Sequence, residues 1–98
     1  MDDLQTDMNR NLMLDGNALG GRFIDIFGVE MTAAPAECAS CGNVTELGGT
    51  LAFTQAPGIV LRCPACENVM LRIVETREFI YLDARGATYL RVDKRANY

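Results

Sequence analysis

The sequence predicts a small β-rich α+β domain, built from antiparallel hairpins and preceded by an amphipathic helix. Three observations carry this prediction. A chain of 98 residues forms one domain at most, here expected to span residues 15–92. Short β-branched and aromatic runs, separated by turn residues, fill much of its second half. Two identical Cys-x-x-Cys pairs lie far apart in the chain, and a shared ligand would join the hairpins that carry them.

The amino-terminal part of the chain divides near Asp15. Residues 1–14 show no sustained period, and we expect them to form a flexible lead-in. Asp15 or Asn17 can then cap a helix that Gly28 ends. Its apolar residues follow helical spacing: Leu19, Phe23, Ile26 and Phe27. Two adjacent glycines near its start either allow close approach to a sheet or precede the helix.

A lead strand and a first hairpin are expected next. Residues 29–33 alternate enough for a short strand, which Pro35 would close. Residues 51–55 and 59–62 flank an Ala-Pro-Gly sequence. In that turn, proline presets one position and glycine supplies the positive φ that the next position needs. The turn therefore predicts a hairpin that leads directly into the second cysteine pair.

A second hairpin and a final strand complete the predicted domain. Residues 69–75 and 79–83 are β-branched and aromatic runs on either side of a polar turn. Another turn, at 84–86, leads into a strand at 88–92. The polar residues 93–98 are expected to form a flexible tail.

The cysteines indicate a tetrathiolate metal site: Cys38, Cys41, Cys63 and Cys66. Each Cys-x-x-Cys turn brings two sulfurs together and directs backbone N–H groups toward them. Two such turns supply the four ligands of a tetrahedral structural zinc ion, and we expect one Zn²⁺ per chain. Glu67 follows the second pair, where such turns often have glycine, so we expect backbone strain at Glu67 or Asn68.

The same sulfurs allow other chemistry. Mononuclear iron accepts the same four ligands. Four cysteines can also form disulfides in three ways, whereas a thioredoxin-type redox pair needs a helix start within a βαβ unit, which neither pair has. The first residues lack the basic and apolar regions of a secretory signal, and no apolar run has the length of a membrane span. We therefore expect a cytoplasmic protein with reduced thiols, which favours metal over disulfides.

Composition argues against several classes of function. The chain has no histidine and no glycine-rich phosphate loop, so we predict no catalytic residue and no enzyme activity. Its net charge of −4 repels nucleic acid overall. That charge is uneven, because residues 1–37 carry seven acids and two bases, whereas residues 38–98 carry six acids and seven bases.

Several segments resemble a known family. The two cysteine turns look like those of a zinc ribbon, a rubredoxin-like fold in which hairpin tips clamp one metal ion. More specifically, four stretches resemble an uncharacterised bacterial family known only as a domain of unknown function: residues 14–18, 27–32, 55–58 and 61–64. The likeness spans roughly residues 14 to 92. It implies the four cysteines as metal ligands and implies no catalytic residue.

These observations lead to three hypotheses about function. The first is a non-enzymatic protein whose structural zinc stabilises a module that binds a partner protein. The second is a zinc ribbon that binds nucleic acid, since basic residues accompany Phe79, Tyr81 and Tyr89 in the sequence: Arg62, Arg72, Arg77, Arg85, Arg91, Lys94 and Arg95. Strand alternation predicts instead that those aromatic residues are core and the arginines are solvated. The third is a rubredoxin-like iron electron carrier. Exposed strand edges would also suit a homodimer, and no membrane role is expected.

Overall fold

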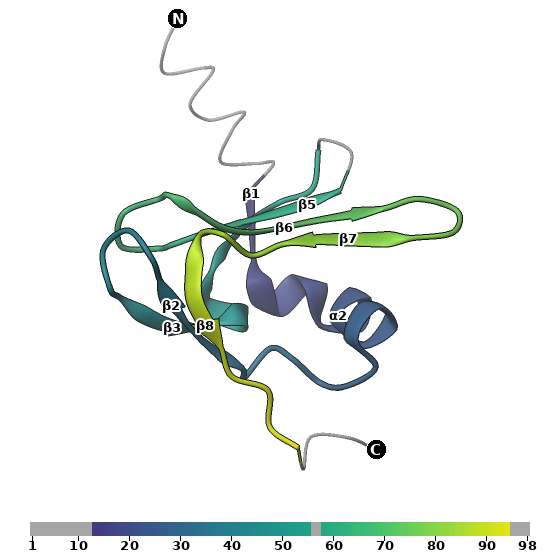
Figure 1. Ribbon diagram of the computed structural model, residues 1–98, viewed down its shortest axis with the longest axis horizontal. Coiled ribbons are helices and arrows are strands. Elements are labelled where there is room, and N and C mark those ends of the chain that lie inside the picture. Colours follow the sequence, from purple (N-terminus) through teal and green to yellow (C-terminus); the bar gives the residue numbers. More distant parts are fainter. Residues whose placement is uncertain (1–12, 56–57, 95–98) are drawn as a thin grey trace, which may run out of the picture.

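The computed structural model describes residues 13–55 and 58–94, and it contains two antiparallel sheets and one short α-helix (Figure 1). The helical elements are η1 (Gly16–Leu19), α2 (Gly20–Phe27) and η2 (Leu47–Gly49), of which η1 and η2 are 3₁₀ turns. The strands are β1 (Met13–Asp15), β2 (Pro35–Cys38), β3 (Val44–Glu46), β4 (Leu51–Phe53), β5 (Ile59–Arg62), β6 (Val69–Glu75), β7 (Ile80–Asp83) and β8 (Ala87–Leu90). The large sheet has the order β1-β4-β5-β6-β7, and the small sheet has the order β3-β2-β8.

The predicted amphipathic helix is confirmed, and α2 lies beneath the large sheet (Figure 1). Asp15 caps the preceding 3₁₀ turn, because its carboxylate accepts a hydrogen bond of 3.3 Å from the Ala18 N–H. Gly28 ends α2 in the left-handed conformation, with φ of 77°. The apolar face of α2 points to the sheet, and Phe23 is completely buried there.

The hydrophobic core lies between α2 and one face of the large sheet, here called the inner face. Strand alternation places on this face five residues that are at most 2% exposed: Ala52, Ile59, Leu61, Leu71 and Ile73. The opposite, outer face carries Phe53, Arg62, Arg72 and Tyr81. The same buried cluster continues into the loop after α2, the small sheet and η2 through Met31, Ala36 and Leu47.

The predicted lead strand at residues 29–33 is wrong. These residues form a loop, in which the Glu30 carboxylate accepts a hydrogen bond of 2.7 Å from the Thr32 N–H. The Ala34 N–H donates to the Met31 carbonyl at 3.0 Å and closes a turn. Pro35 begins strand β2 instead of ending a strand, which its missing N–H permits at a first strand position.

Both predicted hairpins are confirmed, as β4–β5 and β6–β7. The predicted last strand is present as β8, but it pairs with β2 in the small sheet. Strand β1 pairs with β4 and includes residues 13 and 14 of the predicted lead-in. Residues 1–12 of the predicted lead-in, residues 56–57 of the predicted Ala-Pro-Gly turn and residues 95–98 of the predicted tail lie outside the described residues. Within the described part of the chain, no helix has the length and apolar character needed to cross a membrane.

The expectation that the aromatic residues of the last strands are core is wrong. Phe79 and Tyr81 are each 59% exposed, and Tyr89 is 44% exposed. Tyr81 is exposed because strand alternation places its side chain on the outer face of the sheet, away from α2. Phe79 lies in the turn of the β6–β7 hairpin, and this turn extends beyond α2 (Figure 1).

Gly86 lies where the segment between β7 and β8 crosses β6, and it provides a test of the packing between the two sheets. A Cβ atom at Gly86 would lie 1.8 Å from the Val69 carbonyl oxygen. The Gly86 carbonyl also accepts a hydrogen bond of 2.9 Å from the Ala39 N–H. We expect Gly86→Ala to lower the free energy of unfolding by about 1–3 kcal/mol, measured by urea denaturation, because the backbone must shift.

The matched control is Gly21→Ala in α2, where an added Cβ meets no atom within 4 Å. Because alanine has the higher helix propensity, this change should raise the free energy of unfolding by about 0.5 kcal/mol. If the two substitutions changed the free energy of unfolding equally, the short distance to the Val69 carbonyl oxygen would not be the reason for glycine at position 86.

Candidate metal centre

The two cysteine pairs occupy hairpin turns of different sheets. Cys38 and Cys41 lie at the turn between β2 and β3, in the small sheet. Cys63 and Cys66 lie at the turn between β5 and β6, in the large sheet. Both turns are at the same end of the molecule, on the left in Figure 1. The candidate site therefore joins the two sheets.

The two turns have the same backbone hydrogen bonds. In the first turn, the Gly42 N–H donates to the Cys38 carbonyl at 2.9 Å, and the Cys38 N–H donates to the Asn43 carbonyl at 2.8 Å. The second turn repeats these bonds at the equivalent positions, at 2.8 and 2.9 Å. Each turn thus reverses the chain in the same way, and this reversal brings its two sulfurs together.

The strain predicted after the second cysteine pair is confirmed at Glu67. Gly42, which follows the first pair, has φ of 78°. Glu67 occupies the equivalent position with φ of 65°, and it is the only non-glycine residue with positive φ in the part of the chain that the structure describes. A side chain in this conformation costs about 1–2 kcal/mol, which the surrounding hydrogen bonds have to offset.

The four sulfurs form one cluster, as predicted, and all lie within 4.8 Å of one another. The Cys38 and Cys66 sulfurs are 3.6 Å apart, and the Cys41 and Cys63 sulfurs are 3.7 Å apart. A disulfide bond would be about 2.05 Å long. A tetrahedral ion with Zn–S bonds of about 2.3 Å separates its sulfurs by about 3.8 Å. The spacing therefore fits four ligands around one metal ion.

Burial and backbone donors change the acidity of the inner thiols. Cys38 and Cys63 are buried, whereas Cys66 is half-buried and Cys41 is exposed. Burial raises the pKa of Cys63, but backbone N–H groups of Cys66 and Ala65 oppose it and the pKa falls to about 7. The backbone N–H of Cys41 likewise lowers the pKa of Cys38. These N–H groups stabilise thiolates, which is the form that binds metal.

The acidity of Cys41 shows what a cation would contribute to the cluster. The backbone N–H of Asn43 lowers the pKa of the Cys41 thiol, but desolvation and the sulfurs of Cys66 and Cys63 raise it. The resulting pKa of Cys41 is about 12. The fourth thiolate therefore does not form readily beside the other sulfurs. A divalent cation offsets this repulsion and releases the remaining protons when it binds.

Two asparagines link the turns, and sequence reasoning missed them. The Asn43 side-chain amide, from the first turn, donates toward the Cys63 sulfur at 3.9 Å. The Asn68 side-chain amide, from the second turn, donates to the Ser40 hydroxyl. The signal was present, since each asparagine is the second residue after a cysteine pair. The repeated unit is thus Cys-x-x-Cys-x-Asn, with one cross-link in each direction.

The basic residues of the nucleic-acid hypothesis do not form a cluster at the cysteine site in the part of the chain that the structure describes. Arg62 lies 5.6 Å from the centre of the Phe53 ring, and its guanidinium donates to the Glu67 carbonyl at 2.9 Å. Arg72 is exposed on the outer face, and Arg85 is paired with Asp83. Arg95 lies outside the described residues.

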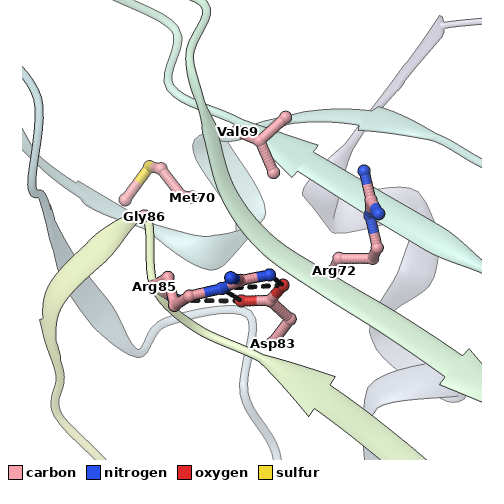
Figure 2. Close-up of a pocket in the computed structure, with 6 residues that line it drawn as sticks. All are labelled: Val69, Met70, Arg72, Asp83, Arg85 and Gly86. Atoms are coloured by element: carbon pink, nitrogen blue, oxygen red, sulfur yellow. Dashed lines mark hydrogen bonds and ion pairs between the residues drawn. The ribbon is translucent and has the colours of Figure 1, made fainter.

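A cleft of about 220 Å³ lies beside β6, and an ion pair occupies its polar side (Figure 2). The Asp83 carboxylate accepts bonds of 3.0 and 2.7 Å from the Arg85 guanidinium, and one of 3.1 Å from the Arg85 N–H. These bonds lower the pKa of Asp83 to about 2. The pair fixes the turn that leads from β7 to β8. The lining residues are Val69, Met70, Arg72, Asp83, Arg85 and Gly86.

Equivalent positions in the two turns provide a test of the backbone strain. Glu67→Gly should raise the free energy of unfolding of the zinc-loaded protein by about 1 kcal/mol, because glycine accepts positive φ. Gly42→Ala should lower it by about 1 kcal/mol. Urea denaturation measures both changes. The control is Glu46→Gly, at an exposed position with φ of −73°, which should be destabilising. Equal destabilisation by the two glutamate-to-glycine changes would contradict the role of φ.

Comparison with known proteins confirms the expected family likeness. The profile of a family of unknown function, DUF6510, matches residues 7–95. Neither the curated proteins nor the solved structures gave a match. The matched segment includes both cysteine turns and all of the described residues. The chain belongs to the DUF6510 family.

Proposed function

We propose that this chain is a non-enzymatic, cytoplasmic zinc protein, in which one structural Zn²⁺ ion holds together a rubredoxin-like zinc ribbon that binds protein. One observation carries the proposal. Two Cys-x-x-Cys turns from different sheets bring four sulfurs within 4.8 Å of one another. Cys38, Cys41, Cys63 and Cys66 would bind the ion, and the ion would supply charge neutralisation and a fixed angle between the hairpins.

A structural role follows from the ligand set. Four thiolates complete the tetrahedral coordination of zinc and leave no position for a substrate. Two of the ligands, Cys38 and Cys63, are also part of the hydrophobic core. Zinc binding contributes about 10 kcal/mol or more to folding in small zinc domains, which is as large as the whole stability of a typical domain.

Zinc is favoured over iron on chemical grounds. Four thiolates bind either ion, and iron would make the protein an electron carrier. Zinc has no redox chemistry, and closed sites with four cysteines are typical of structural zinc. In a reducing cytoplasm the thiols stay available for it. Purified protein that is coloured by iron–thiolate absorption would replace this assignment with the electron-carrier hypothesis.

Protein is favoured over nucleic acid as the partner. Several arginines already have acidic neighbours: Arg85 binds Asp83 at 2.7 Å, and Arg22 binds Glu75 at 2.6 Å. The net charge of −4 adds a repulsive field. In contrast, apolar side chains are exposed along the β6–β7 hairpin. Apolar and aromatic surface of this kind is typical of protein interfaces.

Elemental analysis tests the zinc site. We expect one zinc ion per chain, and we expect Cys38→Ser and Cys63→Ser each to lose the metal and most of the cooperative unfolding transition. A chelator should have the same effect on the unsubstituted protein. The control is Ala39→Ser, which adds the same hydroxyl at an exposed, non-ligand position beside Cys38. Cooperative unfolding of either cysteine variant at the unsubstituted midpoint would contradict a structural role.

Fluorescence anisotropy tests the choice of partner. With labelled single-stranded DNA and RNA at low salt, where phosphate contacts are strongest, we expect no saturable binding. Saturable binding that weakens with added salt would support the nucleic-acid hypothesis instead.

A further inference from the structure

Strand β7 is apolar on both of its faces and exposed on both. Phe79 and Tyr81 point to the outer face and are 59% exposed, and their rings are 6.4 Å apart. Ile80 and Leu82 point to the inner face, yet they are 46% and 47% exposed. Inner-face residues of the neighbouring strand, such as Ile73, are buried. The hairpin therefore displays a strand of largely apolar composition that the described residues cover only in part.

The backbone of β7 is also unpaired along one side. β7 is the last strand of the large sheet and pairs only with β6 among the described strands. The Thr76 N–H donates to the Phe79 carbonyl at 2.8 Å, so this pair closes the hairpin. Alternation then directs the N–H and C=O groups of Ile80 and Leu82 away from β6, toward the open edge.

This edge is short, with four residues, but it lacks the other features that usually prevent strand association. Protected edges carry lysine, proline or a bulge. The sequence of β7 is Ile-Tyr-Leu-Asp, and its pairing with β6 has no register shift. Its one charged residue, Asp83, is held by Arg85. The edge is thus open to another strand both in its backbone and in its side chains.

We propose that β7 pairs in antiparallel fashion with β7 of a second copy of this chain, about a two-fold axis at Tyr81. In this register Ile80 lies opposite Leu82 of the partner subunit, and Tyr81 lies opposite Tyr81 of the partner subunit. The two pairs of Ile80 and Leu82 exchange four backbone hydrogen bonds, which satisfy every outward group of both strands. The two large sheets become one continuous sheet. This inference deepens the proposed function and rests on it, since it names the surface and the partner of the interaction module.

Side-chain chemistry supports a second copy as the occupant. On the outer face, the two tyrosines form a non-hydrogen-bonded pair, in which facing side chains are closest. On the inner face, isoleucine faces leucine. Charge does not oppose this pairing, although the whole chain carries −4. Residues 76–85 contain two acids, Glu78 and Asp83, and two bases, Arg77 and Arg85, so the hairpin is locally neutral.

The available area predicts a reversible dimer. Four half-exposed side chains and one strand edge would bury on the order of 400 Å² on each copy, or about 800 Å² in total, against about 1,600 Å² for a standard stable interface. Such an interface is too small for an obligate dimer. The dimer should therefore form and dissociate with concentration, and each chain should remain folded when alone.

Sedimentation equilibrium of the zinc-loaded full chain, over a wide range of concentrations, tests the proposal. We expect the mean mass to rise from that of one chain toward that of two. Tyr81→Lys places two like charges opposite each other at the axis and should raise the dissociation constant at least about tenfold. Leu82→Pro should do the same, because it removes an outward N–H and leaves the bonds to β6 intact.

The matched control is Tyr89→Lys, an equal substitution at a 44% exposed tyrosine in β8 of the small sheet. It should dimerise like the unsubstituted protein. The proposal is overturned if the chain keeps the mass of one copy at every concentration, as expected if β7 binds a different protein, or if Tyr89→Lys weakens association equally.

Zinc content and urea midpoints of the same samples separate this inference from the zinc proposal. A folded, zinc-loaded protein that stays monomeric overturns the dimer and leaves the structural zinc in place. A protein that dimerises through β7 without bound metal overturns the structural zinc and leaves the dimer in place.

Discussion

The meeting of four sulfurs at one end of the molecule is the constraint on which the rest of the structure depends. Cys38 and Cys41 come from the small sheet, and Cys63 and Cys66 come from the large sheet. Four thiolates would repel one another, as the high pKa of Cys41 reflects, and the cation that we propose would offset this repulsion. A bound ion would fix the angle between the two hairpins. The close approach at Gly86 and the shared core would then depend on that angle.

Strand β6 connects this centre to the exposed hairpin. It begins directly after the second cysteine turn, and its far end forms the hairpin with β7 (Figure 1). Between those ends, Leu71 and Ile73 anchor it in the core. The metal end and the exposed apolar end therefore have separate roles. In our proposal the ion organises the fold, and the hairpin displays the surface for protein interaction.

Local features of this fold were predictable from the sequence, and long-range pairings were not. The Asp15 cap, both hairpins and the strain at Glu67 follow from residues close in sequence. The cysteine cluster joins distant residues, and it was predictable because the shared chemistry of a metal ligand set relates its two pairs. Strands β1 and β3 have three residues each, too few to give a periodic signal, and their partners are fixed by tertiary packing. The loop at 29–33 depends on the Glu30 side chain bonding Thr32, which strand periodicity does not encode.

X-ray absorption at the metal edge of the purified protein tests the central claim most directly, because it counts and identifies the atoms bound to the ion. We expect zinc with a first shell of four sulfurs at about 2.3 Å and no oxygen or nitrogen neighbour. A shell with fewer sulfurs, or one that includes a solvent oxygen, would contradict a closed structural site. It would also mean that the two sheets are not locked together through their cysteine turns.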